Sequence, residues 1–160
     1  MLQKCRQMLK NEKGLTLIEL LAVVVILGII AAIAIPSIGG LLDNSKKDAH
    51  VANAQQMANA AKLAVTSDPS LSQGKVYITL NYLEDKKYLE KVKDPDGTVD
   101  TYVKGLLPIT TGDTAPETGS YVYILNGNVE SVKLVNSTRG VKTAAGGPVL
   151  IKDLKRDSVN

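Results

Sequence analysis

The sequence predicts an α+β protein in which one long N-terminal helix packs against a small antiparallel β-sheet domain. Three observations support this prediction. An almost unbroken apolar run covers residues 15–35, a mostly alanine stripe at helical spacing continues to about residue 66, and residues 67–160 hold short alternating segments separated by turn residues. Helices and strands in separate stretches of a chain are typical of the α+β class.

The apolar run is long enough to cross a membrane. It has 21 residues, which is about 31 Å of helix and matches the ~30 Å hydrocarbon core of a bilayer. The segment before it carries the whole net charge of the chain, +3, from Lys4, Arg6, Lys10 and Lys13 against Glu12. Basic residues beside a span hold that end in the cytoplasm, so we expect residues 36–160 on the far side of the membrane.

A cleavable secretory signal peptide is the main alternative for this segment. Residues 32–34 read AIA, which is similar to a small-x-small cleavage site, and a basic region precedes the run. Three features argue against it. The run is longer than the usual stretch of about 7 to 15 residues, it contains Glu19, and a helical pattern continues beyond it.

A second helical segment follows the apolar run. Apolar residues recur every three or four positions on one face, which is made of Val51, Ala54, Ala58, Ala61 and Val65, with Met57 and Ala64 beside them. Because most of these residues are alanines, a packing partner can approach the helix closely. The segment is expected to end near residue 66, since Pro69 biases Asp68 away from helical geometry.

Four residues are expected to weaken the helix between or within its two halves. Pro36 removes an amide donor, and Gly28, Gly39 and Gly40 each cost about 1 kcal/mol relative to alanine. The sequence therefore predicts an interrupted helix, with a kink or a local loss of helicity at these residues.

Residues 67–160 are expected to form a β-rich domain. The clearest element is a hairpin at 120–135, whose flanks alternate in β-forming residues around Asn126, Gly127 and Asn128. The weaker expectations are strands at 75–80 and 147–154, a short helix or turn at 80–89, and loops at 94–100 and 110–120.

Cys5 is the only cysteine of the chain. It precedes the apolar run, whereas a lipid-bearing cysteine would have to follow it, so we expect neither a lipoprotein nor an intrachain disulfide. The region from about residue 136 onward must therefore be held by other contacts, or it is mobile.

One carboxylate, that of Glu19, lies in the fifth position of the apolar run. Insertion scales give a cost of roughly 2.5 to 3.5 kcal/mol for an ionised Asp at the centre of a membrane helix, and we expect a cost of that order for Glu. One interpretation is an acid near a helix end that reaches the membrane interface. The other is an acid that pairs with an opposite charge, which makes a charge in lipid tolerable.

Residues 13–37, KGLTLIELLAVVVILGIIAAIAIPS, resemble the type IV pilin family, which includes the pilin-like subunits of type II secretion and of competence systems. The shared features are a short charged leader, a glycine at the cut, threonine second and glutamate fifth in the processed chain, an internal glycine at Gly28 and a proline at Pro36. Leu15 stands where phenylalanine is commonest in the family, a variation that leaves cleavage possible.

This resemblance implies a leader, residues 1–14, that a membrane-embedded prepilin peptidase removes by cutting after Gly14 and N-methylating the new terminus at Leu15. It also implies that Glu19 pairs with the free amino terminus of a neighbouring subunit and so sets the stagger between subunits. The apolar helices, residues 15–35, would then leave the bilayer and form the core of a filament, with the globular domains of the pilin fold as its sheath.

A loop at residues 93–102, KDPDGTVDTY, is loosely similar to a stretch of major pseudopilins, some of which bind calcium nearby. Asp94, Asp96 and Asp100 offer hard oxygen ligands, but their spacing is not that of an EF-hand, and a plain acidic turn is the favoured interpretation. His50 is the only histidine, so neither a histidine-paired nucleophile nor a multi-histidine metal site is expected. We expect His50 to be a solvated helix residue, and we expect no catalytic residue, no cofactor and no enzyme.

Two groups of basic residues could contact DNA in a filament that takes up DNA. They are Lys86, Lys87, Lys91 and Lys93, and separately Lys152, Lys155 and Arg156. Acidic residues interleave with both groups, which favours a solvated mixed-charge surface: Glu84, Asp85, Glu90, Asp94, Asp153 and Asp157. The stretch 136–138 fits a glycosylation sequon, a pattern short enough to occur often by chance.

The sequence leaves three functions open. The first is the structural subunit of an extended type IV pilus, and the second is a pseudopilin of a type II secretion or competence machine. The third is a signal-anchored surface domain that binds something and does not polymerise. The expected partners are other copies of this chain, prepilin peptidase, the pilus assembly machinery and the lipid bilayer. The chain is expected in the cytoplasmic membrane as a single-pass precursor and then in a pilus at the cell surface.

Overall fold

The computed structural model of the protein describes residues 16–97 and 101–160. The expected leader with Gly14, the expected methylation site Leu15 and the candidate ligand Asp100 lie outside the described residues. The chain divides into two units, residues 1–42 and residues 43–160, and each is described by itself. The predicted α+β class is confirmed, because one long helix precedes a six-stranded antiparallel sheet.

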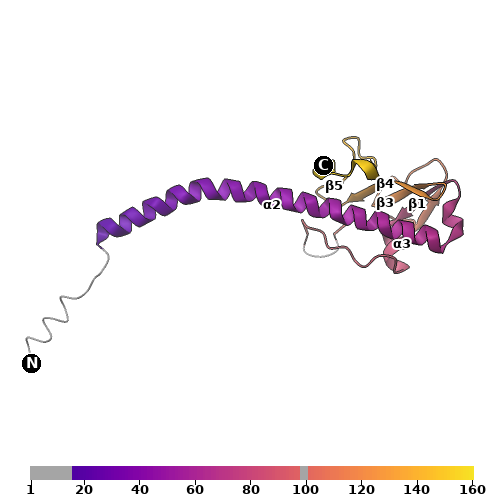
Figure 1. Ribbon diagram of the computed structural model, residues 1–160, viewed down its shortest axis with the longest axis horizontal. Coiled ribbons are helices and arrows are strands. Elements are labelled where there is room, and N and C mark those ends of the chain that lie inside the picture. The colour runs from indigo at the N-terminus through magenta and orange to yellow at the C-terminus, as the bar shows by residue number, and fades with distance from the viewer. Residues whose placement is uncertain (1–15, 98–100) are drawn as a thin grey trace, which may run out of the picture. The chain divides into compact units, whose positions relative to one another are not determined.

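Helix α2 covers Leu17–Ser67 without a break (Figure 1). It continues through all four of the residues expected to interrupt it, Gly28, Pro36, Gly39 and Gly40. A local loss of helicity at these residues is therefore not seen in the isolated chain, and a kink there stays a prediction. Pro36 removes one helical hydrogen bond, and each glycine raises the entropic cost of ordering the backbone. A break would cost more, because about four N–H and four C=O groups would lose their helical partners at the two new ends.

In residues 17–42 the helix exposes its large apolar side chains. Leu17 is 87% exposed, Ile33 is 72% exposed and Leu41 is 71% exposed. By length and composition α2 is able to cross a membrane, and none of its most apolar stretch is buried. This part of the helix therefore lacks a covering partner within the described chain.

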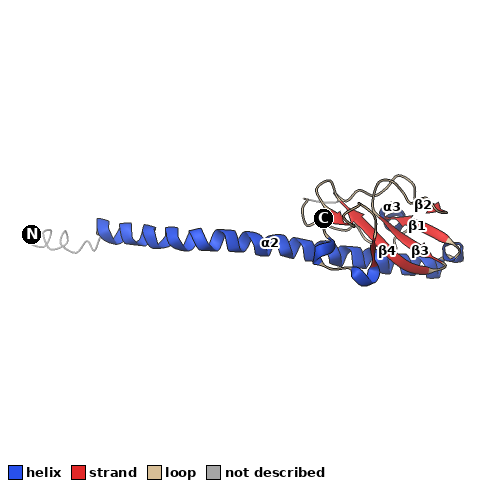
Figure 2. Ribbon diagram, turned by 90° about the horizontal axis from the view of Figure 1, so that it is seen from above, coloured by secondary structure: helices blue, strands red, loops and turns tan. Residues whose placement is uncertain are grey.

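In residues 43–67 the same helix lies along the sheet (Figures 1 and 2). The side chains that it buries are those of His50, Ala54, Met57, Ala58, Ala60, Ala61 and Ala64. The predicted alanine stripe is confirmed at its centre, while Val51 and Val65 are half-buried at its margins.

The sheet has the strand order β2-β1-β3-β4-β5, with β6 also paired to β4 (Figure 2). The strands are β1 Lys75–Thr79, β2 Ile109–Thr111, β3 Tyr121–Leu125, β4 Asn128–Val135, β5 Gly140–Val141 and β6 Val149–Leu150. Every pair is antiparallel. Alternate residues of the three longest strands join the helix alanines in one core: Val76, Ile78, Val122, Ile124, Val132 and Leu134.

The predicted hairpin is confirmed in β3 and β4. Asn126 and Gly127 both have positive φ, 48° and 83°, as a type I′ turn requires, and Leu125 pairs with Asn128 across the turn. This turn matches the right-handed twist of the flanking strands, which explains why the Asn-Gly signal was strong.

The weaker expectations are confirmed in part. The strand at 75–80 is β1, and helix α3, Leu80–Asp85, occupies the first half of 80–89. The strand expected at 147–154 is only β6, followed by a 3-10 turn at Ile151–Asp153. The loop expected at 110–120 was wrong at its start, because residues 110 and 111 belong to the edge strand β2, where β-branched side chains pair with β1.

The C-terminal region is held without a disulfide. Gly140 and Asn160 exchange two backbone hydrogen bonds of 3.0 Å each, and Val141 forms a bridge with Val159. Arg156 forms an ion pair of 2.6 Å with Asp48 of α2. These contacts hold the region from about residue 136 onward, as the lack of an intrachain disulfide required.

We expect Gly140→Ala to destabilise the domain strongly. A Cβ atom at this position would lie 2.2 Å from the carbonyl oxygen of Leu134 and 2.5 Å from the Cα of Val135. Because both are backbone atoms, β4 and β5 would have to part, at a cost of about 3 kcal/mol or roughly 10 °C in Tm. Thermal unfolding of the full chain in detergent measures this.

The control for this change is Gly146→Ala. A Cβ there meets no atom within 4 Å, and only the positive φ of 83° is strained, so the expected loss is about 1 kcal/mol. Equal losses for the two variants would contradict the steric explanation.

Candidate functional site

The first turn of α2 carries a capping box made by Thr16 and Glu19. Glu19 Oε2 accepts hydrogen bonds from the backbone N–H of Thr16 at 2.7 Å and from its hydroxyl at 2.8 Å. In return, Thr16 Oγ1 accepts a hydrogen bond from the backbone N–H of Glu19 at 3.3 Å. The signal for this box is Thr-x-x-Glu at residues 16–19, which the sequence reading missed.

The capping box gives the carboxylate of Glu19 two donors within its own chain. A polar group in apolar surroundings is costly unless it is hydrogen-bonded, so these donors lower the cost of placing Glu19 in a membrane. The box uses the peptide N–H of Thr16, which would remain if the chain were cut after Gly14. The expected pairing of Glu19 with a neighbouring subunit stays a prediction.

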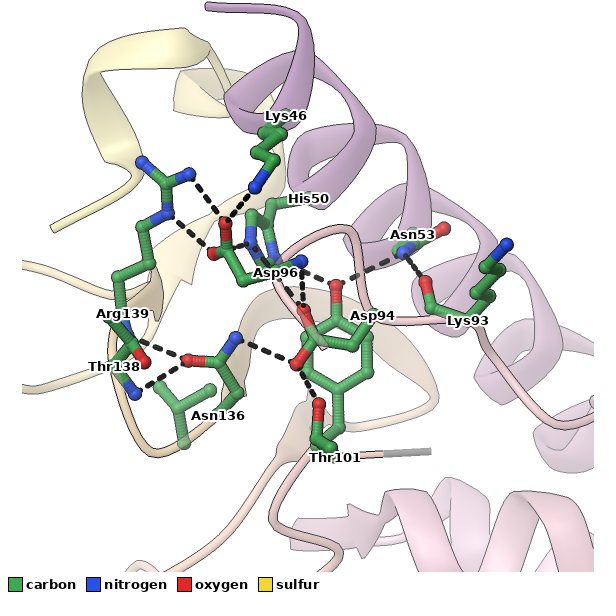
Figure 3. A network of polar contacts seen from close by, with 12 residues as sticks. Lys46, His50, Asn53, Lys93, Asp94, Asp96, Thr101, Asn136, Thr138 and Arg139 are labelled. Atoms are coloured by element: carbon green, nitrogen blue, oxygen red, sulfur yellow. Dashed lines mark hydrogen bonds and ion pairs between the residues drawn. The ribbon is translucent and has the colours of Figure 1, made fainter. Parts of the chain in front are cut away.

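A second candidate site lies within residues 43–160, where α2 meets residues 91–97, residues 101–102 and the turn between β4 and β5 (Figure 3). Helix α2 contributes residues three or four positions apart, which lie on one face. We call this group the polar network, and it consists of Asp43, Lys46, His50, Asn53, Asp94, Asp96, Thr101, Tyr102, Asn136 and Arg139.

His50 lies at the centre of the polar network and is fully buried. The expectation of a solvated histidine is therefore wrong. A signal for burial was present in the sequence, because His50 precedes Ala54 by four residues and Met57 by seven, which places it on the predicted alanine stripe.

The hydrogen bonds around His50 define its tautomer. Asn53 Nδ2 donates one proton to the carbonyl oxygen of Lys93 at 2.9 Å and the other to the hydroxyl oxygen of Tyr102 at 3.0 Å. The Tyr102 hydroxyl is then free to donate to His50 Nδ1, 2.7 Å away. The ring proton therefore lies on Nε2, which donates to Asp96 Oδ2 at 2.8 Å. Both ring nitrogens of His50 therefore have hydrogen-bond partners.

Asp94 is buried and fully hydrogen-bonded, and so does not belong to a solvated surface as expected. Its Oδ1 accepts from the backbone N–H of Asp96 at 2.9 Å. Its Oδ2 accepts from Asn136 Nδ2 at 2.7 Å and from the Thr101 hydroxyl. Burial alone raises the pKa of the Asp94 carboxyl, but these hydrogen bonds outweigh it, and the pKa is lowered from its ordinary value.

Arg139 joins two carboxylates that come from distant parts of the chain. Its Nε and one terminal nitrogen bond both oxygens of Asp96, at 2.6 and 2.7 Å, and its other terminal nitrogen bonds Asp43 at 2.6 Å. Lys46 adds a contact of 3.5 Å to Asp96. The hydrogen bonds from Arg139 hold the pKa of Asp96 far below its usual range and lower that of Asp43.

Asn136 shapes the turn that carries Arg139. Its side-chain oxygen accepts from the backbone N–H groups of Thr138 and Arg139 at 2.8 and 2.7 Å. Its side-chain nitrogen is committed to Asp94. The amide that a glycosylation sequon would modify thus makes structural hydrogen bonds at both ends.

Three potential metal ligands come together in the polar network. One atom each from His50, Asp94 and Asp96 lies within 4.8 Å of the others. The structure thus brings together two of the three aspartates considered for calcium, while Asp100 lies outside the described residues. The oxygens of Asp94 and Asp96 accept hydrogen bonds from protein donors, so the contacts favour the interpretation as a structural turn.

The second basic group makes ion pairs with acidic residues. Arg156 bonds Asp48 through two nitrogens, at 2.8 and 2.6 Å, and Lys155 lies 3.9 Å from Asp157. Glu84 is buried beside Lys104 at 2.6 Å, so this acid is not part of the solvated surface that the sequence predicted. DNA binding stays an untested expectation.

We expect Asp96→Asn to lower stability at neutral pH and to flatten its dependence on acid. Because the folded pKa of Asp96 is depressed, its stabilisation is present above the unfolded pKa of about 4 and is lost as the pH falls below that. The variant leaves Arg139 with one carboxylate fewer, at a cost on the order of 3 kcal/mol. Unfolding of the full chain in detergent, followed from neutral to strongly acid pH, measures both effects.

The matched control is Asp113→Asn, at an exposed carboxylate that pairs with Lys75 on the surface. It should change neither the midpoint nor the acid dependence appreciably. If wild type and Asp96→Asn gave parallel curves against pH, the stabilising role of the Asp96 charge would be refuted.

Residues 9–35 match the family model described as the prokaryotic N-terminal methylation motif. The match covers residues 9–14 of the basic segment, the capping box and the first part of α2. No solved structure matches the chain significantly. The resemblance found in the sequence is confirmed for this segment, which carries the class III signal sequence of type IV pilins.

Proposed function

We propose that this chain is a pilin that is cut after Gly14, methylated at Leu15 and polymerised into a type IV pilus at the cell surface. The methylation motif supports a type IV pilin-like precursor that prepilin peptidase processes. The long helix followed by a small antiparallel sheet fits the pilin fold.

The observation that carries this proposal is the uncovered apolar surface of α2 in residues 17–42. Apolar surface left in water costs about 25 cal/mol for each Å². A bilayer covers such a surface in the precursor, and the same helices from other copies cover it in a filament. A helix that is apolar on all sides is suited to both surroundings.

Glu19 gives this assembly its register. In the proposed filament its carboxylate pairs with the methylated amino terminus of a neighbouring subunit, because an acid and an amine stabilise each other in apolar surroundings. Only one axial offset between two helices brings the two groups together. Gly28, Pro36, Gly39 and Gly40 permit a local loss of helicity as the helices pack, although α2 is continuous in the isolated chain.

The first test is the intact mass and N-terminal peptide of the protein recovered from its native cell surface. We expect a chain that begins at N-methylated Leu15. A chain that begins at Ile35 would indicate an ordinary secreted domain, and one that retains Met1 would indicate a simple membrane anchor. Either result would remove the amino terminus that the proposal pairs with Glu19.

The second test separates the two roles of Glu19. Glu19→Gln keeps an oxygen that can accept from Thr16 but removes the charge, whereas Thr16→Val removes the hydroxyl of the capping box and keeps the charge. We expect Glu19→Gln to insert and be processed but to form no filaments, because a neutral amide cannot form an ion pair with the protonated amino terminus. Membrane fractionation and electron microscopy of sheared filaments measure insertion and assembly.

Normal filaments from Glu19→Gln would refute charge pairing. If Thr16→Val failed to assemble while Glu19→Gln succeeded, the capping box would be the reason for the glutamate. The same variants address the third function, since a monomeric anchored domain should be indifferent to Glu19→Gln.

A pseudopilin is the second candidate, favoured by the loose similarity of residues 93–102 to major pseudopilins. Three described residues of that stretch, Asp94, Asp96 and Tyr102, are built into the polar network. Gold-labelled antibody against the globular domain distinguishes the two functions on native cells. Labelled filaments that extend from the surface support a pilus, and label confined to the envelope supports a pseudopilin.

A further inference from the structure

We propose that Arg139 is a built-in cation that holds Asp96 and the turn between β4 and β5 against α2, so that this site needs no bound divalent ion. This inference concerns how the globular domain is held together. It goes beyond the proposed function and does not depend on it.

The site has the geometry that usually calls for a cation. Asp94 and Asp96 converge on His50, and one potential ligand atom from each of the three lies within 4.8 Å of the others. Carboxylates that are brought close together repel each other unless a positive charge lies between or beside them. Some cation must therefore compensate them in the folded chain.

Arg139 supplies that charge with a matching shape. Its planar guanidinium grips both oxygens of Asp96 and reaches Asp43 with its remaining nitrogen. Three parallel or forked contacts of this kind are beyond the reach of a lysine ammonium, which is a single point of charge. The Arg139 side chain is only 17% exposed, so these bonds are largely shielded from water.

The oxygens that a metal ion would need are already in use. Both oxygens of Asp96 face Arg139, with Lys46 and His50 beside them. Both oxygens of Asp94 accept from Thr101, Asn136 or the backbone. A divalent ion would have to displace several of these donors to gain its oxygen ligands.

The cluster also has cations of its own. The polar network sets Asp43, Asp94 and Asp96 against Lys46 and Arg139, and Lys47, just outside the network, pairs with Asp43 at 3.2 Å, which makes three carboxylates and three side-chain cations. A divalent ion would add two positive charges to a cluster in which the aspartates are already matched by side-chain cations.

Closing Arg139 onto α2 also holds the end of the chain. Asn136 fixes the backbone of Arg139 through its side chain, and its N–H donates to the Arg139 carbonyl oxygen at 2.9 Å. The next residue, Gly140, exchanges two hydrogen bonds with Asn160. The guanidinium therefore anchors the turn from which the C-terminal region is held.

The experiment compares Arg139→Met with Arg156→Met in the full chain in detergent, each with excess EGTA and with added calcium chloride. Arg156 is the matched control, because it also bonds an aspartate of α2 through two nitrogens but is half-exposed, and its hydrogen bonds within the described residues go to Asp48. Thermal unfolding followed by the near-UV circular dichroism of the tyrosines gives Tm.

We expect the wild-type Tm to be the same in EGTA and calcium to within about 1 °C, since no ion is needed. Arg139→Met should lower Tm by about 10 °C or more, because it leaves carboxylates without their cation, and Arg156→Met by about 3 °C or less. A wild-type Tm several degrees higher in calcium than in EGTA would overturn the proposal. Equal shifts in the two variants would overturn it too.

If Arg139→Met showed no cooperative transition, Arg139→Lys and Arg156→Lys would replace the pair. Lysine keeps the charge but loses the fork, so we expect a larger fall in Tm for Arg139→Lys than for Arg156→Lys. Equal falls in Tm would show that the forked contact of Arg139 matters no more than the exposed one of Arg156, contrary to the fit described above.

Discussion

The structure depends on one constraint, that a single helix must suit two surroundings. In residues 17–42 α2 is apolar on all sides and uncovered, while in residues 43–67 it buries one stripe against the sheet. A stripe of alanines lets the sheet approach closely, and their small side chains leave the packing volume to the valines, isoleucines and leucines of the strands. The domain is thus built around half of a helix whose other half belongs to a different environment.

The polar network holds the region after β4 against α2. The region after β4 must return to α2, and no disulfide is available to hold it there. Hydrogen-bonded charges serve instead, with Arg139 gripping Asp43 and Asp96. Such a network stabilises a fold only when every buried member has a partner, since one unpaired charge costs more than a lost contact. The polar network can stabilise the domain because the polar atoms of His50 and Asp94 all have hydrogen-bond partners.

The periodic parts of this fold could be predicted from sequence, and the non-local parts could not. The alanine stripe and the Asn126-Gly127 turn are local signals, each expressed within a few residues. Arg139 meets Asp43 across 96 positions, and nothing near either residue indicates the other. The burial of His50 and the box of Thr16 with Glu19 did have local signals, in the helical spacing and in Thr-x-x-Glu, which were overlooked. The continuity of α2 through Pro36 was missed because local penalties were not weighed against the cost of two helix ends.

The capping box changes the energetics of the proposed assembly. Without the capping box, Glu19 in a membrane would be an unpaired acid. Pairing with an amino terminus would then recover the full free-energy cost of burying the carboxylate. With it, the carboxylate already accepts two hydrogen bonds from Thr16. The driving force from charge pairing is therefore the difference between a charge-assisted pair and those internal bonds. A smaller difference in free energy favours a subunit that is stable in the bilayer before assembly. The packing of the apolar helices must then supply the remaining free energy of assembly.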